Sequence, residues 1–142
     1  MQSKMQGNLV FVRLFPGENV HASLEAVGRK HKLRTAVIAS GLGAFGECEL
    51  GYFVKKGEYL RRTWKEAVEL VALSGLFSRN AEKGFDFHLH ACIGDSGHKA
   101  WGGHLFNAVV HVTNEITLLA SKARVYRKTE EATGLKGLYC KP

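Results

Sequence analysis

The stretch Phe85-Asp86-Phe87-His88-Leu89-His90-Ala91-Cys92-Ile93 alternates apolar and polar side chains along its whole length. Alternation with a period of two is typical of a β-strand that buries one of its faces. The apolar members are expected to face a hydrophobic core. The opposite face receives Asp86, His88, His90 and Cys92, so the stretch predicts a half-buried sheet with two histidines on its open side.

Most of the remaining chain is also expected to form β-strands. Short runs rich in β-branched and aromatic residues, separated in several places by glycines, indicate seven or eight strands in total. In residues 19–31 the apolar residues have the spacing of an amphipathic helix, and Asn19 is the expected N-cap. No later segment is long enough for crossover helices, so the expected fold class is α+β, a mostly antiparallel sheet of about seven strands flanked by one main helix. The further expected strands are 8–15, 35–40, 47–53, 59–64, 67–77, 108–112 and 116–126.

Length and composition limit the classes of protein to which the chain can belong. Its 142 residues suit one domain, expected over residues 8–142, with residues 1–7 as a disordered leader. No stretch approaches the ~20 apolar residues of a membrane-spanning helix, and the polar start lacks the apolar part of a signal peptide, so we expect no membrane partner and a cytoplasmic location. Three cysteines without CxxC spacing favour reduced thiols over disulfides or a four-cysteine zinc site.

The chain is basic, with 20 Lys and Arg against 13 Asp and Glu and a net charge of +7. The basic residues cluster at 29–34, 55–65 and 122–128, where they could attract phosphate-bearing partners such as DNA. Ordinary solvated strand faces explain these clusters equally well. No helix-turn-helix or zinc-finger spacing is present, so the sequence shows no element that would read a DNA sequence.

His88 and His90 are candidate metal ligands because residues two apart on a strand point to the same side. They lie roughly 6.6 Å apart along the strand, close enough to converge on one ion with ring nitrogens ~2.0 Å from it. Two histidines on a solvated sheet face are the alternative. Cys92 lies two residues further on, too far to share an ion easily with His88.

A third ligand is expected from His98, His104 or His111. His98 lies in a polar, glycine-rich loop, and His111 has the opposite strand parity to His104. His104 follows Gly102-Gly103, which permits close approach to a neighbouring strand. The predicted site is therefore His88, His90 and His104, holding zinc or another divalent transition metal with an open fourth position.

Two carboxylates could add chemistry to such a site. Glu115 could orient a histidine, bind the metal or act as a general acid or base, or it could simply be a polar residue at a strand start. Glu69 interrupts an apolar strand, where it would either pair with a partner such as Arg13 or face solvent.

Gly41, Gly43 and Gly46 match the GxGxxG pattern of dinucleotide-binding proteins. That reading requires a helix after the glycines, whereas Glu47–Phe53 is expected to be a strand. We therefore expect a tight glycine turn at a close approach of two backbones.

Several segments together resemble the plant-and-prokaryote-conserved (PPC) domain. They are Val12–Glu18, Ser40–Ala44, Glu69–Gly75, and above all His88-Leu89-His90 followed by Gly102-Gly103-His104-Leu105. The resemblance implies a homotrimer with an antiparallel sheet and a stand-alone prokaryotic member. Family members are habitually described as DNA-binding, but the AT-hooks that bind DNA in the plant proteins have no counterpart here.

Together these observations lead to one expected function and one alternative. The first is a homotrimeric, metal-binding PPC module that associates with DNA or with a protein. The alternative is a zinc-dependent enzyme of lyase or hydrolase type, in which the ion acts as a Lewis acid on a small oxygenated metabolite and Glu115 or Glu69 moves protons.

Overall fold

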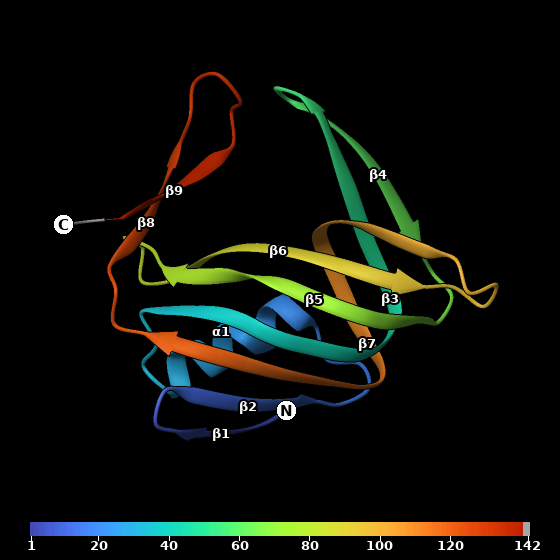
Figure 1. Ribbon diagram of the computed structural model, residues 1–142, viewed down its shortest axis with the longest axis horizontal. Coiled ribbons are helices and arrows are strands. Elements are labelled where there is room, and N and C mark those ends of the chain that lie inside the picture. Colours follow the sequence, from blue (N-terminus) through green and yellow to red (C-terminus); the bar gives the residue numbers. More distant parts are fainter. Residues whose placement is uncertain (141–142) are drawn as a thin grey trace.

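The computed structural model describes residues 1–140, which form nine strands and one helix (Figure 1). No helix among these residues is long and apolar enough to cross a membrane. The elements are β1 (Gln2–Gln6), β2 (Leu9–Leu14), α1 (Val20–Lys30), β3 (Thr35–Lys55), β4 (Glu58–Trp64), β5 (Val68–Arg79), β6 (Phe85–Gly94), β7 (Ala100–Ser121), β8 (Val125–Thr129) and β9 (Lys136–Cys140).

Seven of the strands form one antiparallel sheet in the order β1-β2-β7-β6-β5-β3-β4. Because β7 also pairs with β3, the pairings β7–β6–β5–β3–β7 close on themselves. The predicted α+β class, with a mostly antiparallel sheet of seven strands and one helix, is confirmed. Strands β8 and β9 form a separate hairpin.

Helix α1 begins where the sequence indicates and covers one side of the sheet. The Asn19 side chain accepts a hydrogen bond from the Ala22 amide at 3.0 Å, which satisfies an amide that the first helical turn leaves unpaired. Val20, Leu24 and Val27 are fully buried, as their helical spacing requires. The hydrophobic core lies between this face of α1 and the alternate residues of the strands.

Two pairs of predicted strands are in fact single long strands. Strand β3 runs through both 35–40 and 47–53, and the expected glycine turn between them does not form. The glycines instead serve register shifts and close approaches: Gly43 has φ +140°, and a Cβ there would lie 2.0 Å from the Thr113 carbonyl oxygen. Strand β7 likewise begins at Ala100 and runs without a break to Ser121, so it includes His104.

Residues 2–6, which the sequence assigns to a disordered leader, form β1 at the edge of the sheet. Every residue of β1 pairs with β2, from Gln2 opposite Arg13 to Gln6 opposite Leu9. The Lys30 ammonium donates to the Ser3 carbonyl at 2.9 Å and ties β1 to the helix. An exposed edge strand has no buried face, so its sequence carries no apolar alternation that would reveal it.

Two hairpins rise from the same side of the body in Figure 1. One is β3–β4 and the other is β8–β9, and we call them the two arms. The arms touch where the Lys56 ammonium donates to the Glu131 carbonyl at 2.6 Å. The stacked rings of Tyr126 and Tyr139, 5.5 Å apart, join β8 to β9.

Candidate metal centre

His88, His90 and His104 come together on adjacent strands. His88 and His90 lie on the open face of β6, where their exposure contrasts with that of Leu89 between them, which is fully buried. Strand β7 places His104 directly opposite His90 in the antiparallel register. Their candidate ligand atoms all lie within 4.8 Å of one another.

The spacing of the rings fits a single metal ion. The Nε2 atoms of His88 and His90 are 3.2 Å apart, and the three ring centroids are separated by 5.1, 5.4 and 5.5 Å. Two nitrogens bound to one tetrahedral zinc ion at ~2.0 Å are about 3.3 Å apart. The first pair already has this separation, and the candidate ligand atom of His104 lies within 4.8 Å of both.

The surroundings of His88 and His104 lower the pKa of each and so favour their uncharged forms. Burial, followed by the charges of His88 and His90, lowers the pKa of His104 from 6.5 to about 4. Burial and the nearby Arg127 guanidinium lower the pKa of His88. A neutral imidazole has a free ring-nitrogen lone pair, which is the form that binds a metal.

Aromatic side chains form one wall of the site. The Phe106 ring meets His104 edge-on at 4.8 Å, and the Tyr59 ring lies 6.1 Å from it. The Arg61 guanidinium covers Phe106 at 3.7 Å. Gly51, the register partner of His104 on β3, leaves room for this wall, because a Cβ there would lie 2.3 Å from the Phe106 ring.

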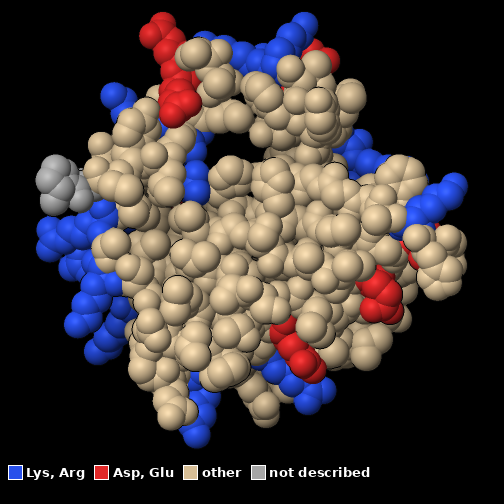
Figure 2. Space-filling view, in the orientation of Figure 1, with Lys and Arg blue, Asp and Glu red and all other residues tan. Residues whose placement is uncertain are grey.

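The other side of the site is open and carries a positive charge. A cavity of about 160 Å³ is bordered there by Ser74, Leu76, His88, His90 and Arg127, the last from β8. Figure 2 shows the opening between the two arms in the space-filling view. Among residues 1–140, no carboxylate or cysteine joins the three-histidine group. A bound ion would therefore keep a fourth position that the described residues do not fill.

The other residues singled out in the sequence lie elsewhere. His98 is in the exposed loop before β7, and His111 is exposed on β7 itself. Glu115 is exposed between Arg13 of β2 and Leu42 of β3. Glu69 is exposed opposite Gly94, so the solvent-facing alternative holds for it. The roles suggested for the two glutamates at the metal are not supported by these positions.

The cysteines are free thiols, as expected. Cys48 is fully buried, and burial raises its pKa to about 11. Cys92 lies on β6 opposite Gly102, outside the histidine group.

Sequence reasoning missed Arg127, Tyr59 and Phe106 as neighbours of the histidines. Arg127 appeared only as part of a basic cluster, because nothing local shows that β8 contacts β5 and brings Arg127 to the cavity at His88. The contacts of Tyr59 and Phe106 depend in the same way on the long-range pairing of β3 with β4 and β7.

A protein-family model covers both strands that carry the histidines, β6 and β7. The model of the Plants and Prokaryotes Conserved (PCC) domain matches residues 1–122. The chain belongs to this family. It is the PPC family that the sequence resembles, and the match includes the residues of β1 but not those of the β8–β9 arm.

Curated and solved relatives extend the comparison. The chain is 31% identical over 133 residues to a bifunctional protein GlmU of Synechococcus, and it spans about a fifth of that protein's length. A "putative DNA binding protein" from Bacteroides thetaiotaomicron superposes with a TM-score of 0.90 at 27% identity, covering 98% of this chain and 96% of the other. A "metal-containing protein" from Archaeoglobus fulgidus superposes with a TM-score of 0.82 at 27% identity, covering 98% and 99%.

Proposed function

We propose that this PPC domain binds one zinc-class divalent ion through His88, His90 and His104. The observation that carries the proposal is the convergence of three imidazoles from two adjacent strands within 4.8 Å. Further support comes from the Archaeoglobus relative, which is named as metal-containing. Zinc bound there would have three histidine ligands and an exchangeable fourth position, an arrangement that polarises a bound water or carbonyl.

Metal analysis of protein purified without a histidine tag tests this proposal. After loading with zinc and removal of the excess, wild type should retain about one ion per chain. His90→Ala should lose it, whereas His98→Ala, which alters an exposed histidine outside the cluster, should retain it. Cobalt loading adds a visible absorption band that reports tetrahedral ligands. A wild type that retains no metal, or a His90→Ala protein that retains it unchanged, would remove the site.

We propose in addition that the domain assembles as a homotrimer, the state that the family resemblance implies. Support comes from an apolar strip on the sheet. Leu9, Leu119 and Val37 are direct register neighbours across β2, β7 and β3, and they are 38%, 41% and 39% exposed. A contiguous apolar strip is a typical interface between subunits.

Light scattering coupled to size exclusion tests this assembly. Wild type should have three times the mass of the chain, and Leu119→Glu should lower that mass by placing a charge in the strip. Leu60→Glu, a change at a 63% exposed residue of β4 outside the strip, should keep it. A monomeric wild type would exclude the trimer, and dissociation by Leu60→Glu alone would exclude this face.

A second candidate function is association with nucleic acid. It is favoured by the net charge of +7 and by the name of the Bacteroides relative. A cationic surface with no element that contacts base edges predicts nucleic-acid binding that does not depend on the base sequence. Such binding weakens steeply as the salt concentration rises. If the protein binds a labelled DNA duplex at low salt and releases it at moderate salt, this function is supported. No retention at low salt would exclude it.

A further inference from the structure

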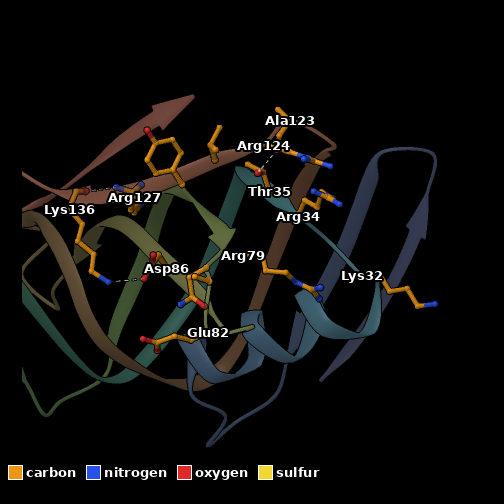
Figure 3. Close-up of a pocket in the computed structure, with 14 residues that line it drawn as sticks. Lys32, Arg34, Thr35, Arg79, Glu82, Asp86, Ala123, Arg124, Arg127 and Lys136 are labelled. Carbon is orange, nitrogen blue, oxygen red and sulfur yellow. Dashed lines mark hydrogen bonds and ion pairs between the residues drawn. The ribbon is translucent and has the colours of Figure 1, made fainter. Parts of the chain in front are cut away.

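A second, larger cavity lies at a different place in the fold (Figure 3). Its volume is about 1050 Å³, and it is bordered by the turn after α1, the β5–β6 turn, the β7–β8 linker and β9. We call it the basic cleft because six basic side chains line it against two acidic ones. The basic residues are Lys32, Arg34, Arg79, Arg124, Arg127 and Lys136, and the acidic ones are Glu82 and Asp86.

Hydrogen bonds hold together the segments that carry these cations. The Arg79 amide donates to the Arg34 carbonyl at 2.7 Å, which fixes the end of β5 beside the start of β3. The Thr35 hydroxyl donates to the Ala123 carbonyl at 2.9 Å, which fixes the linker that carries Arg124 (Figure 3). Three segments far apart in sequence are therefore fastened together with their positive charges on one side.

Few of these charges are neutralised by the protein itself. Asp86 already pairs with Lys136 at 3.0 Å, and the Arg127 guanidinium donates to the Lys136 carbonyl at 2.9 Å. No ion pair of the described residues involves Lys32, Arg34, Arg79 or Arg124. Figure 2 shows Lys and Arg side chains gathered at the edge of the molecule where β5 and β7 end. Like charges held close together repel, and a bound anion would remove that repulsion.

Guanidinium groups determine which anion suits the cleft. Arg presents a planar fork of N–H donors that matches the oxygens of phosphate. The cleft volume is close to the upper end of the range for small-molecule sites, roughly 300–1,000 Å³. Cations supplied by three separate segments could engage more phosphate oxygens than one phosphate group presents.

We propose that the basic cleft binds a small molecule that carries two or more phosphate groups, held chiefly by Arg34, Arg79 and Arg124. None of these three arginines borders the cavity at the histidine cluster, so the proposal does not depend on metal binding. A nucleic-acid strand is the competing ligand. The small volume of the cleft and the hydrogen bonds that hold its bordering segments together favour a compact ligand.

Titration calorimetry of the full chain with inorganic tripolyphosphate at low salt tests the proposal. Wild type should bind one tripolyphosphate per chain with micromolar affinity. The double variant Arg34→Gln/Arg124→Gln should lose roughly tenfold or more of that affinity. Lys65→Gln/Lys99→Gln removes the same net charge from exposed positions outside the cleft and should stay within about twofold. The thermal midpoint of each variant shows that it is folded.

Three results would overturn the proposal. The first is no heat of binding with wild type at low salt. The second is an equal loss of affinity in both double variants, which would show that only net charge matters. The third is displacement of tripolyphosphate by a DNA duplex of about 30 base pairs, with the Arg34→Gln/Arg124→Gln variant losing duplex affinity as strongly as tripolyphosphate affinity. That result would assign the cleft to nucleic acid.

Discussion

Replacing Gly103 by alanine should disturb the proposed metal centre without changing a histidine. A Cβ at this position would lie 2.7 Å from the Gly51 carbonyl oxygen, and ordinary contact begins at 3.4 Å. Strands β3 and β7 would therefore have to separate by about 0.7 Å, the difference between these two distances. The shift falls on the register pair Gly51–His104, so it moves the backbone of a proposed ligand.

The expected cost in the free energy of unfolding is about 1–3 kcal/mol, the usual range for an overpacked interior. This corresponds to roughly 3–10 °C in thermal midpoint for a domain of this size. We also expect the zinc affinity to fall roughly tenfold, as it does when the support of a metal ligand is disturbed.

Gly102→Ala is a matched control in the neighbouring residue. A Cβ there would lie 3.6 Å from the Ala91 carbonyl oxygen, an ordinary contact, and Gly102 is exposed. Its stability should change by less than about 0.5 kcal/mol, or rise slightly, because alanine restricts the unfolded chain. Urea unfolding and zinc titration of both variants provide the test. Equal behaviour of the two alanines would show that the close approach of β3 and β7 does not position His104.

Three further results are expected. Asn19→Ala removes the cap on the Ala22 amide and should lower the free energy of unfolding by about 1 kcal/mol in urea titrations, with α1 losing its cap. Leu89→Ala empties a fully buried position and should cost about 2–5 kcal/mol, whereas Val71→Ala, at a 60% exposed position, should cost little. Because the pKa of His104 is depressed in the folded state, the unfolded state binds the extra proton first, so the metal-free protein should lose stability as the pH falls from 6.5 towards 4. His104→Gln should flatten that slope, and thermal unfolding across this pH range measures it.

The open face of β6 could be predicted because the alternation of neighbouring residues is enough to define it. Alternation alone separates His88 and His90 from the buried Leu89, and the structure places the side chains accordingly. His104 could be predicted as the third ligand because a double glycine precedes it. That inference used the steric requirement of close strands, which Gly103 meets against the Gly51 carbonyl.

The features that could not be predicted depend on pairing between distant segments. A glycine-rich run such as 41–46 is compatible with both a turn and a bulged strand, and only the pairing of β3 with β5 and β7 decides between them. Strand β1 is polar because it lies at an edge. The basic cleft could not be predicted for the same reason, since Arg34, Arg79 and Arg124 come together through the pairing of β3 with β5 and β7 and through the hydrogen bonds of Arg34 and Thr35.

The β8–β9 arm connects the two sites in one further respect. Arg127 borders both the small cavity at the histidines and the basic cleft, and it lies beyond residues 1–122, which match the family model. The matched part of the chain supplies the three imidazoles, whereas the arm supplies the charge that faces them. A ligand of an ion held by the three histidines, as proposed, would meet the Arg127 charge, so relatives with the same histidines but a different arm should favour ligands of different charge.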